Sequence, residues 1–108
     1  MIIAISTDKK DDLDQPVSEN FGRSQCFCLY NADTEEVIFI ENIAGAGKQN
    51  AGIKTINFLL ELNVDTVLSG RFGTITTVLL KEKNIQIIIP QRTKIVSEII
   101  NQLKNQKL

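Results

Sequence analysis

The stretch that decides the fold is TVLSGRFGTITTVLLKEKNIQIII, residues 66–89. It starts with a short buried run at 66–69, passes through a turn with two glycines, and continues with apolar residues at helical spacing over 75–79. A second apolar run, 85–89, stops at Pro90. A helix that connects two strands places them parallel in one sheet, with a right-handed crossover. The stretch therefore predicts an α/β fold.

Three more apolar runs precede this stretch, and each is typical of a strand: 2–5, 26–30 and 37–40. The turn-forming sequence Asn-Ala-Asp-Thr separates the second run from the third, which predicts a hairpin. Two further helices are expected, one over 53–62 and one that follows the N-cap Thr93 and ends near Leu103. The order β-β-β-α-β-α-β-α predicts a mixed five-stranded sheet with helices packed on it.

The composition fits one folded domain over residues 1–108. Of 108 residues 43% are hydrophobic and 23% are charged, which supplies a core and argues against disorder. The net charge of −1 argues against a general nucleic-acid binder. The charges are unevenly spread, because residues 1–42 carry 9 acidic and 3 basic side chains and residues 81–108 carry 2 acidic and 6 basic ones. Solvated loops and helix surfaces explain this distribution, and two electrostatic faces are the alternative.

The absence of certain residues excludes several function classes. Histidine is missing altogether, which removes the commonest proton shuttle and metal ligand. No base is placed to activate Cys26 or Ser69 as a nucleophile, so we expect a protein that is not an enzyme. The first polar residues follow Ile5 too closely for a signal peptide, and no apolar run is long enough for a membrane span. A cytoplasmic protein is the expectation.

Two cysteines lie two positions apart in the second predicted strand. Because alternate residues of a strand point to the same face, Cys26 and Cys28 would present their sulfurs side by side. Two thiolates are half of the usual ligand set for zinc or an iron–sulfur cluster, which a second chain or the cofactor itself would complete. The alternative is that both are small buried hydrophobic residues of a central strand.

Two short segments are candidates for anion binding. Ser69, Gly70, Arg71 and Gly73 connect a parallel strand to a helix, the place where ligands gather in open α/β sheets. Backbone N–H groups at the helix start and a guanidinium would hold a carboxylate, phosphate or sulfate there. Arg23, in the segment Phe21–Arg23, would be a second clamp. The alternatives are a plain tight turn at Ser69–Gly73 and a hydrophobic plug at Phe21.

Three other patterns fail as functional motifs. The glycine-rich segment 45–52 lacks the spacing of a P-loop and of a dinucleotide fingerprint, and is expected to be a flexible loop before a helix. The acidic run from Asp8 to Asp14 lacks the partner carboxylates of a two-metal nuclease and is expected to solvate a loop. The basic residues of the last helix and the loop before it are expected on its outer face: Arg92, Lys94, Lys104 and Lys107.

Three segments stand out when taken in order: Phe21-Gly22-Arg23, the glycine-bounded helix start at 47–52, and the strand–turn–helix–strand of residues 68–87. Together they resemble the dinitrogenase iron–molybdenum cofactor biosynthesis family, the NifX-like group that also forms the C-terminal part of NifB-type proteins. The resemblance covers nearly the whole chain. It implies a prokaryotic protein with a ribonuclease H-like three-layer fold that binds an iron–sulfur or iron–molybdenum cofactor precursor. Asn20 stands where members often have histidine, so ligation through imidazole is excluded.

The function that follows is binding or carrying rather than turnover. We expect a small anionic ligand or metal cluster at Ser69, Gly70, Arg71, Gly73 and Arg23, with Cys26 and Cys28 as the only soft metal ligands. The alternative is a regulatory or scaffolding module that binds a protein partner without metal. Neither nucleic acid nor membrane is an expected partner, and the oligomeric state is left open.

Overall fold

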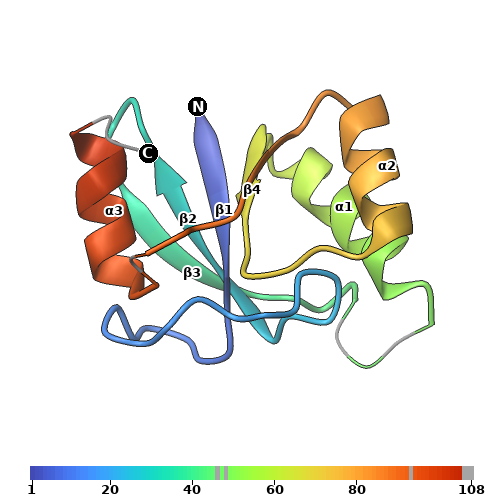
Figure 1. The fold of residues 1–108 in the computed structure, drawn as a ribbon, viewed down its shortest axis with the longest axis horizontal. Helices are drawn as coiled ribbons and strands as arrows, with labels where there is room; N and C mark the ends of the chain where they lie inside the picture. The colour runs from blue at the N-terminus through green and yellow to red at the C-terminus, as the bar shows by residue number, and fades with distance from the viewer. Residues whose placement is uncertain (46, 48, 93, 106–108) are drawn as a thin grey trace.

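The structure is a computed structural model that describes residues 1–45, 47, 49–92 and 94–105. Its strands are β1 (Ile2–Thr7), β2 (Cys26–Asn31), β3 (Val37–Glu41), β4 (Thr66–Leu68) and β5 (Gln86–Ile88). Its helices are α1 (Ala51–Glu61), α2 (Thr74–Glu82) and α3 (Val96–Lys104) (Figure 1). This is the predicted order of elements, with boundaries shifted by one or two residues at several ends.

All strands belong to one mixed sheet, in the order β3-β2-β1-β4-β5. β1 pairs antiparallel with β2 and parallel with β4, and β5 continues the parallel part. β2 and β3 form the antiparallel hairpin. The mixed five-stranded sheet is thus confirmed, whereas the name ribonuclease H-like stays a prediction.

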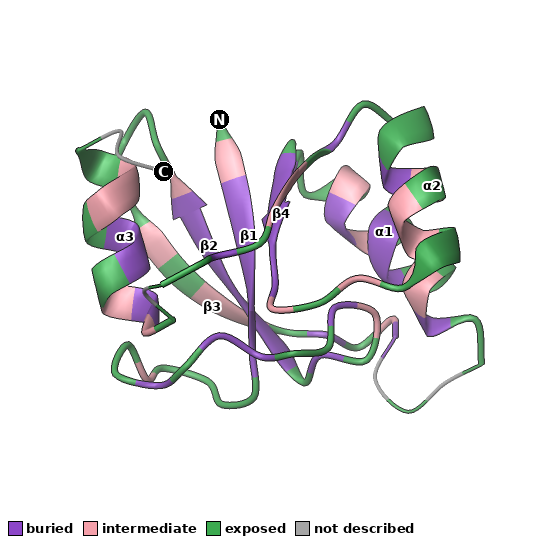
Figure 2. Ribbon diagram, in the orientation of Figure 1, coloured by how far each residue is buried: buried purple, intermediate pink, exposed green. Residues whose placement is uncertain are grey.

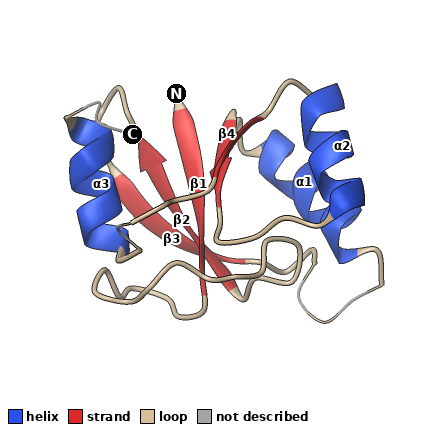
Figure 3. Ribbon diagram, in the orientation of Figure 1, coloured by secondary structure: helices blue, strands red, loops and turns tan. Residues whose placement is uncertain are grey.

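Helices cover both faces of the sheet, which gives three layers (Figure 3). One face packs against α1 and α2 through a cluster that includes Phe27, Ile56, Leu59 and Leu80. The other face packs against α3, where Val96 and the residues after it meet the odd-numbered positions of β1. Because both faces are covered, β1 is buried along almost its whole length, as its run of aliphatic residues predicted (Figure 2).

Two helices differ in detail from the pattern read in the sequence. In α2 the residue that reaches the core is Leu80, which is fully buried, while Ile75 is 72% exposed and Val78 is 50% exposed. The helical spacing at 75–79 marked the helix correctly but did not show which of its residues would face the core. The last helix begins at Val96 with Ile95 at its N-cap. Thr93, the predicted cap, lies outside the described residues.

The arrangement brings two loops together at one end of the sheet. β1 and β4 run parallel, so their carboxyl ends lie at the same end of the sheet. The loop after β4 then meets the segment before β2 through a backbone hydrogen bond from Gly70 N–H to Ser18 O at 3.0 Å. None of the helices in the described part of the chain has the length and apolarity needed to cross a membrane.

Candidate functional site

A cleft of about 450 Å³ opens at the end of the sheet where β1 and β4 finish. Three pieces of chain form it: the segment before β2, the start of α1 and the start of α2. The lining residues are Glu19, Asn20, Phe21, Gly22, Arg23, Asn50, Ala51, Gly52, Arg71, Phe72, Gly73 and Thr76. The cleft therefore lies at the carboxyl ends of parallel strands, where open α/β sheets place their ligands.

The wall of the cleft before β2 is held by close backbone packing and by two buried side chains. A Cβ on Gly22 would lie 2.8 Å from the Cα of Gly52, so only glycine allows these two backbones to approach. Thr55 Oγ1 donates a hydrogen bond to Gly22 O at 2.8 Å. Asn42, 2% exposed, donates from Nδ2 to Ser24 O at 3.0 Å and accepts at Oδ1 from Gly45 N–H at 3.2 Å. These bonds tie the segment to α1.

Aromatic packing joins this wall to the loop after β4. The ring of Phe21 contacts Phe27 in the core, with centroids 5.7 Å apart, and Phe72 at the cleft, with centroids 5.2 Å apart. Phe21 is 3% exposed. Phe21 is therefore the hydrophobic plug that one of the two interpretations of its segment predicted. Its ring also lines the cleft.

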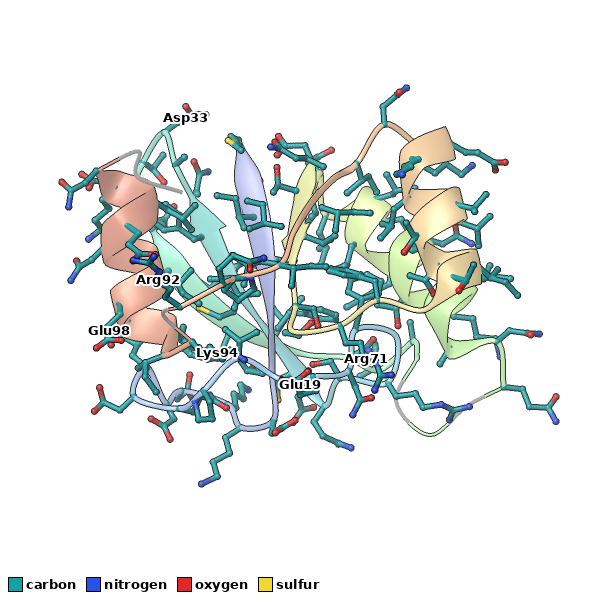
Figure 4. All side chains as sticks on the ribbon, viewed as in Figure 1. Glu19, Asp33, Arg71, Arg92, Lys94 and Glu98 are labelled. Atoms are coloured by element: carbon teal, nitrogen blue, oxygen red, sulfur yellow. The ribbon has the colours of Figure 1, made fainter. Side chains whose placement is uncertain are left out.

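The opposite wall is the turn after β4. Ser69 is fully buried and donates from Oγ to Ser18 O at 3.1 Å. The carboxylate of Glu19 packs over Gly70, because a Cβ at that position would lie 2.8 Å from Glu19 Oε2. The exposed side chain of Arg71 then extends at the cleft beside Glu19 (Figure 4).

Both helices that begin at the cleft have uncapped N-termini. Asn50 and Gly73, the N-cap residues of α1 and α2, make no side-chain capping hydrogen bond, and neither helix has an acidic residue in its first turn. The first intrahelical bonds run from Lys54 N–H to Asn50 O and from Thr77 N–H to Gly73 O. The N–H groups before these positions have no partner within their helices, and the positive ends of two helix dipoles meet at one place.

The charges around the cleft are free to act on a ligand. Arg23 and Arg71 both line it and both are exposed. Within the described ranges, the single ion pair is that of the Met1 ammonium with Asp33, at the other end of the sheet. Neither guanidinium therefore forms an ion pair within the described residues, and Glu19 is the one acidic side chain among those that line the cleft.

Of the residues predicted to bind an anion, the fold brings three to the cleft: Arg23, Arg71 and Gly73. Ser69 and Gly70 lie behind its wall, where their hydrogen bonds to Ser18 O hold the turn. Sequence reasoning missed Glu19. The glycine-rich segment before α1, which the family resemblance implies to border a binding cleft, contributes Asn50 and Gly52 to it, although nothing local places them opposite Arg71.

The cysteines are separated from the cleft by the sheet. Cys28 is fully buried in the core on the α3 face, and Cys26, two residues away in β2, points to the same face. Burial raises the pKa of Cys28 to about 12 and also raises the pKa of Cys26, where the nearby Glu41 adds to the effect. This placement favours the core alternative, and a metal site at the pair stays a prediction.

The raised pKa of Cys28 has a measurable consequence for stability. Its thiol keeps its proton in the folded chain up to about pH 12 but loses it near pH 9 once unfolded. Stability therefore falls as the pH rises above 9, by up to about 1.4 kcal/mol per pH unit from this group. We expect urea unfolding of Cys28→Ala to show a shallower alkaline loss of stability than the unchanged protein. Equal slopes would contradict the buried thiol.

The groups that line the cleft are mainly donors and positive charges. Over the residues that the structure describes, no group of three or more cysteine, aspartate or glutamate side chains could hold a metal ion. What the cleft offers is two guanidinium groups, two sets of helix N-terminal N–H groups and one aromatic surface. This set of donors can hold a compact anion through hydrogen bonds and charge.

Comparison with known proteins identifies relatives for the chain as a whole. The family model described as dinitrogenase iron-molybdenum cofactor matches residues 1–106. The apo form of the orange protein from Desulfovibrio gigas is similar at 21% identity and a TM-score of 0.84, over 98% of this chain and 88% of that one. A proposed NifB protein from Thermotoga, of the DUF35 family, is similar at 24% identity and a TM-score of 0.79, over 98% and 89%. At these identities the solved structures show the fold alone. A search of curated proteins gives no significant match.

Proposed function

Because this chain belongs to the dinitrogenase iron-molybdenum cofactor family, we propose that it is a non-catalytic carrier that holds an anionic iron–sulfur or iron–molybdenum cofactor precursor in the cleft. The observation that carries the proposal is the meeting of two uncapped helix N-termini with Arg23 and Arg71. These groups come from three separate parts of the chain, and each attracts negative charge.

The groups that line the cleft support binding to the outer, negatively charged atoms of such a precursor. The guanidinium groups and N–H groups would bind its sulfide or carboxylate atoms, which carry the negative charge. The described residues offer no thiolate or imidazole at the cleft, so the cargo would be held without a covalent bond to the chain. Weak, reversible binding of this kind suits a carrier, which must also release what it holds.

Purification without oxygen tests the proposal. We expect a coloured protein that contains iron, or iron and molybdenum, and a double variant Arg23→Ala, Arg71→Ala that loses the colour. The variant Cys26→Ser, Cys28→Ser should keep it, because the sheet separates the cysteines from the cleft. Colour that depends on the cysteines alone would instead support the predicted metal site at that pair. A metal-free protein with an intact cleft would contradict carriage.

Glu19 provides a second, independent test. Its carboxylate lies at the cleft and repels an anion, so Glu19→Gln should tighten binding of molybdate or inorganic phosphate by about two- to fivefold. Isothermal titration calorimetry at two salt concentrations measures the effect, which should shrink at high salt. Tighter binding by a matched control, Glu98→Gln on α3, would show that net charge rather than the cleft is responsible.

A further inference from the structure

The β3 strand forms an open edge of the sheet. It pairs with β2 on one side, and among the described residues no strand follows it on the other. Its sequence, Val-Ile-Phe-Ile-Glu, contains neither proline nor lysine, which commonly block strand edges, and its one charged residue, Glu41, is the last of the strand. Ile38 is 53% exposed and lines a hollow of about 200 Å³ together with Ile2, Leu29 and Leu62. The edge thus combines unpaired backbone with apolar side chains.

The register of the hairpin shows which backbone groups point outward. Asn42 N–H donates to Gln25 O at 3.0 Å, and Asn31 N–H donates to Glu36 O at 3.0 Å. Hydrogen-bonded positions alternate along an antiparallel strand, so the even-numbered residues from 36 to 42 face β2. The N–H and C=O groups of Val37, Phe39 and Glu41 therefore face away from the sheet.

These outward positions are self-complementary. If a second β3 runs antiparallel around a two-fold axis at Phe39, then Phe39 faces its own copy and Val37 faces Glu41. Every outward-facing residue then meets another outward-facing residue, and each such pair exchanges two backbone hydrogen bonds. A register shifted by one residue would pair outward groups with inward ones and lose these bonds.

The side chains fit the same register. Ile38 faces Ile40 of the second copy on one side of the joined sheet, and the two Phe39 rings are adjacent on the other. The acidic residues do not oppose one another, since Glu41 faces Val37 and Glu36 faces Asn42. The strand thus matches itself in hydrogen bonding, in apolar contact and in charge, as a symmetric interface requires.

We propose that the chain forms a symmetric dimer in which the β3 edges pair antiparallel and join two sheets into one continuous sheet. The partner is a second copy of this chain, because the match arises from the sequence of β3 alone. No residue that lines the cleft belongs to β3, so dimer formation and anion binding can fail independently.

Sedimentation velocity over a concentration range tests the dimer. We expect the unchanged protein to shift from monomer to dimer as concentration rises. Ile38→Lys should weaken this association at least tenfold, because it places a charge opposite an isoleucine. The control Ile75→Lys alters a more exposed isoleucine on α2, 72% exposed, and should leave the association unchanged. Monomer at every concentration up to about 1 mM, the range of weak binding, would overturn the proposal.

A variant that alters the backbone distinguishes strand pairing from non-specific hydrophobic association. Proline is tolerated at an edge position whose N–H faces away from the sheet, so Glu41→Pro should fold but lose an intermolecular hydrogen bond at each end of the interface. Circular dichroism checks the fold. Hydrogen exchange of the unchanged protein should show the amides of Val37, Phe39 and Glu41 protected only at high concentration. Exchange of these amides that does not depend on concentration would also overturn the pairing.

Discussion

Replacing Arg71 with alanine is expected to weaken binding of molybdate or inorganic phosphate by about 10- to 50-fold, because a charge-assisted hydrogen bond contributes about 1.5–3 kcal/mol and the exposed site reduces that value. The guanidinium lines the cleft without an ion-pair partner among the described residues, so its loss is not offset elsewhere. Calorimetric titration measures the affinity. Stability should change by less than about 0.5 kcal/mol, since the side chain is exposed.

Arg92→Ala is the matched control for this variant. Arg92 is also an exposed arginine, but it lies toward α3, away from the cleft (Figure 4). Its removal lowers the net charge by the same amount and should leave the affinity within about twofold. Equal weakening by both variants would mean that the anion senses only the overall charge, and the cleft would lose its role.

Replacing Asn42 with alanine is expected to destabilise the fold by about 2–4 kcal/mol, because the carboxamide leaves buried backbone groups without partners. Its Nδ2 lies 3.0 Å from Ser24 O and 3.3 Å from Gly22 O, and its Oδ1 accepts from Gly45 N–H. Water cannot easily replace these bonds at a residue that is 2% exposed. Urea unfolding measures the change.

The same variant should also weaken anion binding, because Asn42 fixes the wall that carries Arg23. The control is Asn57→Ala, at an exposed position of α1, which should cost less than about 0.5 kcal/mol. A variant of Asn42 that unfolds at the same urea concentration as the unchanged protein would show that the network does not hold the wall.

Most of the strands and helices were predictable, because their signals are local. Aliphatic runs such as Ile2–Ile5 mark strands buried on both faces, and the glycine turn between two apolar runs indicates a strand, a crossover helix and a parallel strand. The family resemblance was confirmed over residues 1–106. Which residue of a helix is buried depends on its neighbours, and the spacing did not show that Leu80 rather than Ile75 of α2 reaches the core.

Only the part of the candidate site that has a local sequence signal was predictable. The arginines stood out because each follows a glycine in a loop next to a strand, which is a local signal. Glu19 gave no such signal, and its place in the cleft depends on Ser18 accepting hydrogen bonds from Ser69 and Gly70. Contacts between residues this far apart in the chain cannot be read from spacing alone.

By itself, then, the sequence determined the order and type of the elements, the parallel pairing across the crossover helix, and the absence of imidazole chemistry. Hydrophobic periodicity and residue identity carry that information within short windows. Only the tertiary structure decided that two arginines and two helix N-termini share one cleft, that the cysteines face the opposite side of the sheet, and that the outward groups of β3 match their own copy. These properties depend on which distant segments the packed sheet brings together.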